Sequence, residues 1–194
     1  LINRAQEIAQ EDYIERLCQH DENLWPANEE GREEIKKRLG WLEAPLTSEH
    51  FIESSEKLRE LLLGEGYTHA VVLGMGGSSL APEVLRLVHG RGVIGDSPAL
   101  DLTILDSTDP TQVRAAARNA PLEKTLFVFS SKSGTTSEVA AFFEYFWAKA
   151  AARFGDQAGG HFVAITDPGT KLEKLGHERN FRAVLTGDPM VGGR

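Results

Sequence analysis

Side chains with hydroxyl groups are concentrated in one short segment of the chain. Residues 130–138 read Ser-Ser-Lys-Ser-Gly-Thr-Thr-Ser-Glu and follow a β-prone apolar run at 126–129. A glycine-rich segment, Gly-Met-Gly-Gly-Ser-Ser at 74–79, follows a similar run at 71–73. Both segments precede a predicted helix, whose N-terminus offers unpaired N–H groups and a partial positive charge to an anion. Together with the hydroxyl donors, they predict a site for phosphate or a polyhydroxylated sugar.

The first segment, taken alone, has two other interpretations. Its glycines also suit a tight turn from strand to helix that binds nothing. Gly74 and Gly76, with Asp106 after the next strand, partly match the fingerprint of a dinucleotide-binding fold. However, Ser79 stands where that fingerprint has glycine or alanine, which argues against a nicotinamide-dependent oxidoreductase.

The second segment also has a local interpretation. Thr135 and Glu138 are spaced as a capping box, which predicts that they stabilise the start of the following helix. A solvated turn would account for the remaining polar residues, which are Ser131, Lys132, Ser133 and Thr136. Whether the two segments form one site therefore depends on the fold that brings them together.

From residue 67 onward, short apolar runs alternate with helical patterns. The predicted strands cover 69–73, 102–105, 125–130, 162–166 and 182–185, and the predicted helices cover 80–89, 110–119, 137–154 and 170–175. Continuously apolar strands are typical of parallel sheets, so the pattern predicts an α/β fold with a doubly wound, five-stranded parallel sheet. In the flavodoxin-like order 2-1-3-4-5, the first and third strands are neighbours, and both polar segments face one crevice.

Residues 1–66 carry helical patterns that prolines interrupt. We expect them to form an N-terminal helical extension or linker, ahead of a domain over residues 67–194. The chain begins at Leu1 and ends at Arg194, directly after two glycines, and we expect it to be a truncated segment of a longer protein.

The composition narrows the classes of partner. The chain has 194 residues, with 21 basic and 29 acidic side chains and a net charge of −8. An acidic chain without a basic block is a poor candidate for binding nucleic acid or an anionic membrane. A single cysteine, Cys18, and the lack of a signal peptide or a long apolar run lead us to expect a cytoplasmic protein. The histidines lack metal-ligand spacing, so we expect no metal.

Three motifs together resemble the first sugar isomerase (SIS) domain of the glucose-6-phosphate isomerase family. They are Gly-Met-Gly-Gly-Ser at 74–78, Ser-Lys-Ser-Gly-Thr-Thr-x-Glu at 131–138 and Gly-Gly-Arg at 192–194, in this order. The resemblance covers about residues 67–194, roughly two thirds of the chain, and the second motif is specific. The chain also resembles the isomerase half of bifunctional transaldolase–phosphoglucose isomerases, in which residues 1–66 would be a linker or extension.

The resemblance implies an activity and a set of site residues. The family interconverts glucose 6-phosphate and fructose 6-phosphate through an enediolate, in glycolysis and gluconeogenesis, as a homodimer without metal or cofactor. The implied contacts of the hexose 6-phosphate are Ser131, Lys132 (mainly its backbone), Ser133 and Thr136 at the phosphate, and Gly77 and Ser78 beside the sugar. Arg194 would lie next to the reacting carbons, where a permanently cationic guanidinium stabilises a developing oxyanion.

The chain departs from the family pattern after its last motif. The family's general-base glutamate, its ring-opening histidine, which a partner subunit supplies, and a late lysine all lie beyond Gly-Gly-Arg and are absent from this sequence. Without a base at the C2 proton, proton transfer is inefficient, so we expect weak binding at most and no turnover. The main alternative is a non-catalytic SIS module that senses a phosphosugar. Gly-Gly-Arg favours the isomerase, and the acidic 1–66 segment argues against a DNA-binding regulator.

Overall fold

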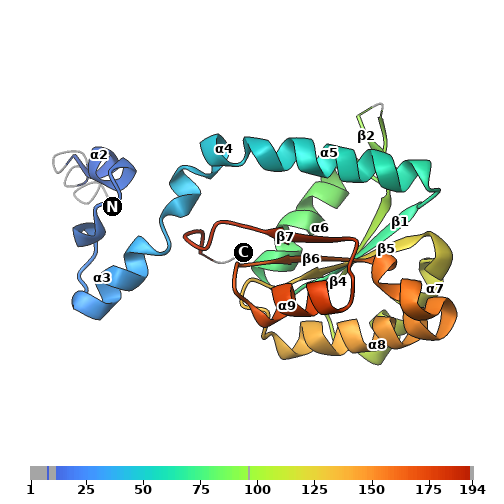
Figure 1. Ribbon diagram of the computed structural model, residues 1–194. Helices are drawn as coiled ribbons and strands as arrows, with labels where there is room; N and C mark the ends of the chain where they lie inside the picture. The colour runs from blue at the N-terminus through green and yellow to red at the C-terminus, as the bar shows by residue number, and fades with distance from the viewer. Residues whose placement is uncertain (1–7, 9–11, 96, 193–194) are drawn as a thin grey trace. The chain divides into compact units, whose positions relative to one another are not determined.

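The computed structural model describes residues 8, 12–95 and 97–192. The chain forms two compact units: Leu1–Phe51 with Asp188–Gly192, and a second unit made mainly of Ile52–Gly187 (Figure 1). The predicted division into residues 1–66 and 67–194 stays a prediction.

The first unit is built from short helices, as the sequence predicts for the N-terminal segment. They are α2 (Tyr13–Cys18), η1 (Glu22–Leu24), α3 (Glu29–Lys36), η2 (Gly40–Leu42) and α4 (Ala44–Thr47). Asn28 begins α3 by accepting the N–H of Gly31 at 2.9 Å, a typical helix cap. The segment Asp188–Gly192 also belongs to this unit, and the N–H of Gly40 donates to the carbonyl of Met190 in that segment at 3.0 Å.

Two kinds of feature are absent from the described part of the chain. None of its helices is long and apolar enough to cross a membrane. No group of three or more histidine, cysteine, aspartate or glutamate side chains gathers there as a candidate metal site.

The second unit contains the predicted parallel sheet. Its strands are β1 (His69–Leu73), β4 (Asp101–Leu105), β5 (Thr125–Ser130), β6 (Phe162–Thr166) and β7 (Ala183–Thr186), in the order β4-β1-β5-β6-β7. All neighbours pair in parallel, with Leu73 opposite both Leu105 and Phe129. Counted along the chain, this order is 2-1-3-4-5, so the predicted α/β fold and strand order are confirmed.

Helices cover both faces of this sheet (Figure 1). One face carries α5 (Glu49–Gly64) and α6 (Gly77–His89), and the other carries α7 (Pro110–Asn119), α8 (Ser137–Phe154) and α9 (Lys171–Glu178). The predicted helices are all present, although α6 begins and α9 ends a few residues outside the predicted ranges. A short antiparallel hairpin of β2 (Val93–Ile94) and β3 (Ser97–Pro98) was not predicted.

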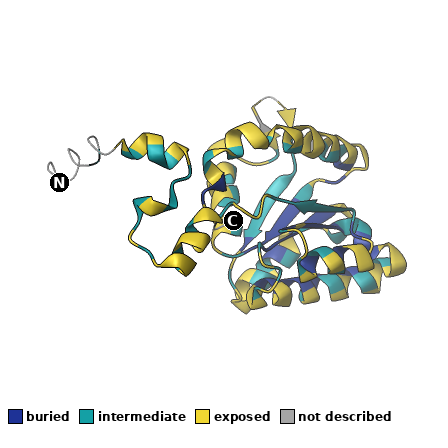
Figure 2. Cartoon of the chain, turned by 60° about the vertical axis from the view of Figure 1, so that its left-hand side comes forward, coloured by how far each residue is buried: buried dark blue, intermediate teal, exposed yellow. Residues whose placement is uncertain are grey.

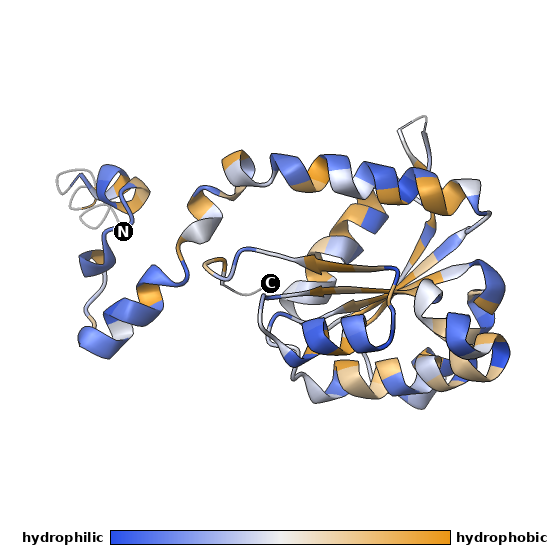
Figure 3. Cartoon of the chain, viewed as in Figure 1, coloured by the Kyte–Doolittle hydropathy of each residue, from blue (hydrophilic) through white to orange (hydrophobic). Residues whose placement is uncertain are grey.

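The core under α7, α8 and α9 is rich in aromatic rings. Phe127, Phe146 and Phe162 are at most 1% exposed. The ring of Phe127 stacks on that of Phe146 at 4.6 Å between centroids and on that of Phe162 at 5.2 Å. Figure 2 shows the inner strands β1, β5 and β6 as mostly buried, and Figure 3 colours much of the sheet as hydrophobic. A tightly packed sheet gives the loops at its carboxyl edge a rigid base.

A polar network ties the amino edge of the sheet together. The guanidinium of Arg182 donates to both carboxylate oxygens of Glu65, at 3.0 and 2.8 Å, and to the carbonyl of Gly160 at 2.7 Å. The same guanidinium lies over the ring of Tyr67, 5.2 Å from its centroid. Hydrogen bonds from Arg182 lower the pKa of the Glu65 carboxyl. The network therefore joins the end of α5 to the starts of β1 and β7.

His161 adds a pH-dependent element to this network. Its Nδ1 lies 3.2 Å from the carbonyl of Thr125, and its ring stacks on Phe154 at 4.1 Å. Burial disfavours the imidazolium and lowers the pKa of His161 below its ordinary value.

We expect the free energy of unfolding to fall as the pH drops below about 6.5, the ordinary histidine pKa. The folded chain binds this proton less readily than the unfolded chain does. The contribution of His161 to stability is therefore fully present above that pH and is lost below it. The slope from this group is at most about 1.4 kcal/mol per pH unit. Urea unfolding between pH 5 and 8, with His161→Asn as the comparison, measures it. Equal pH dependence in both proteins would contradict this role of His161.

Candidate functional site

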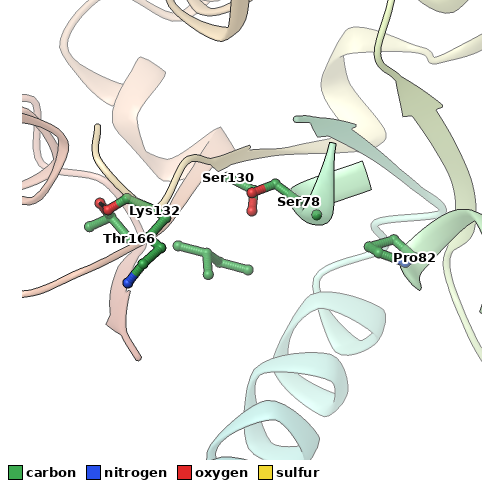
Figure 4. Close-up of a pocket in the computed structure, with 7 residues that line it drawn as sticks. Ser78, Pro82, Ser130, Lys132 and Thr166 are labelled. Atoms are coloured by element: carbon green, nitrogen blue, oxygen red, sulfur yellow. Dashed lines mark hydrogen bonds between the residues drawn. The ribbon is translucent and has the colours of Figure 1, made fainter. Parts of the chain in front are cut away.

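The two polar segments lie at the carboxyl ends of neighbouring strands. Because β1 pairs directly with β5, the loop at 74–76 and the loop at 131–136 meet at one edge of the sheet, as predicted. A pocket of about 170 Å³ opens there, and its lining residues are Gly77, Ser78, Pro82, Ser130, Lys132, Ile165 and Thr166. Figure 4 shows Ser78 next to Ser130, with Lys132 beside Thr166.

Close backbone contacts account for the glycines of the first loop. A Cβ on Gly74 would lie 2.7 Å from the carbonyl oxygen of Ser78, and Gly76 has a φ of +55°. The hydroxyl of Ser79, which is 1% exposed, donates to the carbonyl of Gly76 at 3.0 Å. The glycines of this loop therefore make a tight turn from strand to helix. The turn also delivers Gly77 and Ser78, at the start of α6, to the pocket.

Internal hydrogen bonds order the second loop. The hydroxyls of Ser131 and Thr136 lie 3.1 Å apart, and those of Ser133 and Thr135 lie 2.8 Å apart. The Ser133 hydroxyl also accepts the N–H of Thr135 at 3.2 Å. Ser131 is only 3% exposed. The loop thus holds its hydroxyl groups in defined positions at the start of α8.

The predicted capping box at this helix is wrong. The residue that caps α8 is Thr136, and its side chain makes no capping hydrogen bond within the described residues. Thr135 instead turns back onto Ser133, which removes it from the capping position. An anion is a suitable partner for a long helix that begins in this way.

A third segment, which was not predicted, completes this edge of the sheet. It follows β6 and reaches the second loop through Lys132, whose carbonyl accepts the N–H of Asp167 at 3.1 Å and the hydroxyl of Thr166 at 3.3 Å. The ammonium of Lys132 lies 2.5 Å from a carboxylate oxygen of Asp167. Thr166 and Asp167 stand at the carboxyl end of β6, which is next to β5, and this position could have identified them.

The structure places the predicted site residues in three groups. Those that line the pocket are Gly77, Ser78 and Lys132. Those that lie in the adjoining loop, outside the pocket lining, are Ser131, Ser133 and Thr136. Arg194 lies outside the described residues. The lining residues that sequence reasoning missed are Pro82, Ser130, Ile165 and Thr166.

The strand order and the three loops define a class of protein. This is a doubly wound α/β domain with a pocket at the carboxyl edge of the sheet, at its switch point. The sequence model of the phosphoglucose isomerase family matches residues 55–194, well over half of the chain. The chain belongs to the phosphoglucose isomerase family.

Individual relatives agree with this assignment. The chain is 36% identical to the glucose-6-phosphate isomerase of Prochlorococcus marinus (strain NATL2A) over 134 residues, which are 68% of this chain and 24% of that protein. The solved glucose-6-phosphate isomerase of Chlamydia trachomatis superposes with a TM-score of 0.61 at 30% identity, over 78% of this chain and 28% of that one. A hypothetical protein from Thermus thermophilus, at 21% identity and a TM-score of 0.72, covers 100% of this chain and 43% of its own length, and it shares the fold. The chain spans about a quarter of the length of its first curated relatives.

Proposed function

We propose that this chain forms the phosphosugar-binding part of a glucose-6-phosphate isomerase, which interconverts glucose 6-phosphate and fructose 6-phosphate through an enediolate. The observation that carries the proposal is the meeting of the glycine loop after β1 and the hydroxyl loop after β5 at one pocket. A dinucleotide site would instead use the first loop for a pyrophosphate and would leave the second loop without a role.

Each loop has a separate task in this proposal. The hydroxyls of Ser131, Ser133 and Thr136 and the backbone of Lys132 bind the phosphate, since these groups stand at the start of a long helix. Gly77 and Ser78 lie beside the sugar, where a glycine allows the substrate to approach the backbone. The ion pair of Lys132 with Asp167 supports the backbone role of Lys132, because its ammonium is already directed at a carboxylate.

We further propose that this part binds substrate and does not turn it over. Its pocket of about 170 Å³ is smaller than the roughly 300–1,000 Å³ of complete ligand sites. On α6, Leu80, Val84 and Val88 are each more than half exposed and lie on one helix face. Ile165, in an inner strand, is 41% exposed, although parallel sheets are usually covered on both faces. In longer proteins of this family, we expect the remaining polypeptide to cover these side chains and to supply the general base.

A thermal-shift titration tests the binding proposal. We expect fructose 6-phosphate and 6-phosphogluconate to raise the melting temperature more than inorganic phosphate does, and NAD to leave it unchanged, since stabilisation grows with ligand concentration over Kd. Ser133→Ala should weaken fructose 6-phosphate binding by about tenfold or more, because a hydrogen bond to a charged group contributes about 1.5–3 kcal/mol.

The matched control is Ser55→Ala, which removes an exposed serine hydroxyl from α5. It should bind fructose 6-phosphate like the unaltered chain. A response to NAD alone would overturn the isomerase assignment and favour a dinucleotide site. A response to no ligand would contradict binding by this part alone, and the next test would use a longer protein of the family.

A further inference from the structure

An ion pair crosses from the phosphate loop to the loop after β6. Lys132 and Asp167 are 35 residues apart in sequence, and their charged atoms lie 2.5 Å apart. The two side chains are 25% and 16% exposed, so water screens this pair less than the exposed pairs elsewhere in the chain. A partly buried pair of this kind holds both side chains in one arrangement.

Backbone hydrogen bonds support the same junction. The N–H of Ser131 donates to the carbonyl of Ile165 at 3.0 Å, which continues the pairing of β5 with β6 past the end of the strand. The carbonyl of Lys132 accepts from the N–H of Asp167 and from the hydroxyl of Thr166. A change confined to the Asp167 side chain leaves these backbone bonds in place and removes the ion pair.

The ion pair also determines which groups of the loop can meet a phosphate. With its ammonium directed at Asp167, Lys132 contributes little uncompensated charge, and the loop presents hydroxyl and N–H donors instead. We propose that Asp167 is a positioning residue of the phosphosugar site, which acts through Lys132 to fix the loop at 131–134. The proposal rests on the proposed function, because it assigns that loop to the substrate phosphate.

A double-mutant cycle separates this role from a general structural one. Asp167→Asn and Lys132→Met should each weaken fructose 6-phosphate binding by about tenfold. The double variant should bind no more weakly than Lys132→Met alone, because both changes remove the same interaction. The control, Glu178→Gln, removes an exposed carboxylate from α9 and should leave the affinity unchanged. Losses that simply add would overturn action through Lys132.

A second measurement needs no ligand. The N–H of Gly134 donates to the carbonyl of Ser131 at 3.2 Å within the same loop. Its hydrogen exchange should become at least fivefold faster in Asp167→Asn and should stay the same in Glu178→Gln. Exchange within twofold of the unaltered chain would overturn the proposal. If the unaltered chain binds no phosphosugar, the proposal that this part binds substrate on its own fails, while the exchange rates still decide the role of Asp167.

Discussion

Gly134→Ala is expected to lower the free energy of unfolding by about 2–5 kcal/mol and to abolish binding of fructose 6-phosphate. Gly134 has a φ of +65°, a left-handed conformation that costs a residue with a Cβ about 1–2 kcal/mol. The added Cβ would also lie 2.9 Å from the amide nitrogen and 3.0 Å from the Cβ of Leu172. Overpacking against a backbone atom of this kind typically adds about 1–3 kcal/mol.

The loss of binding follows from where the strain must relax. Leu172 is 1% exposed and belongs to the main core, so it has little room to move. The loop at 131–136 is the freer partner and would shift away from α9. Its hydroxyl groups would then leave the positions that their mutual hydrogen bonds define. Binding geometry is lost by displacements of this size.

Gly169→Ala is the matched control for this prediction. Gly169 also has a positive φ, +77°, but a Cβ there would meet nothing within 4 Å. It should therefore show the backbone cost alone, about 1–2 kcal/mol, with binding retained. Urea unfolding followed by circular dichroism gives the stabilities, and the fructose 6-phosphate titration gives the affinities. Full affinity in a folded Gly134→Ala protein would show that this loop does not contact the substrate.

The sheet could be predicted because its inner strands are mostly apolar. The segments 69–73, 125–130 and 162–166 coincide with β1, β5 and β6, which are inner strands of the sheet. Each is covered on both faces over most of its length, so its residue types are dictated by burial and need no information about partners. From the alternation with helices, the strand order follows by general rules of topology.

Features that depend on hydrogen-bond competition could not be predicted in the same way. Thr135 and Thr136 are both good capping residues, and the spacing to Glu138 favours Thr135. In the structure Ser133 pairs with Thr135, and the helix is capped one residue later. The β2–β3 hairpin could not be predicted for a different reason, which is that strands of two residues show no periodicity.

The candidate site shows the same division. Both loops carry their chemistry in consecutive residues, and the pocket contains the predicted Gly77, Ser78 and Lys132. Thr166 and Asp167 carry no such local pattern, because their role depends on a contact with a residue more than thirty positions away. Only the pairing of β5 with β6 reveals it.

Of the glycine-to-alanine changes at positions 134, 159, 160 and 169, Gly159→Ala is expected to destabilise the second unit most. Gly159 lies in η4 (Gly155–His161), where a Cβ would stand 2.1 Å from the carbonyl oxygen of Arg179 and 2.3 Å from that of Asn180. Both contacts are with backbone, so no side-chain rotation can relieve them. We expect a loss of more than about 3 kcal/mol of unfolding free energy, and incomplete folding at 37 °C.

The neighbouring glycine provides the comparison for this prediction. At Gly160 the nearest atom to an added Cβ is a guanidinium nitrogen of Arg182 at 4.0 Å, so Gly160→Ala should change stability by less than about 1 kcal/mol. The two adjacent glycines receive the same methyl group, but only Gly159 faces backbone atoms at close range. Circular dichroism melts of both variants measure the difference. Equal melting temperatures would mean that the turn at Arg179 and Asn180 moves to accommodate the added methyl group. They would also mean that the aromatic core does not depend on this close contact.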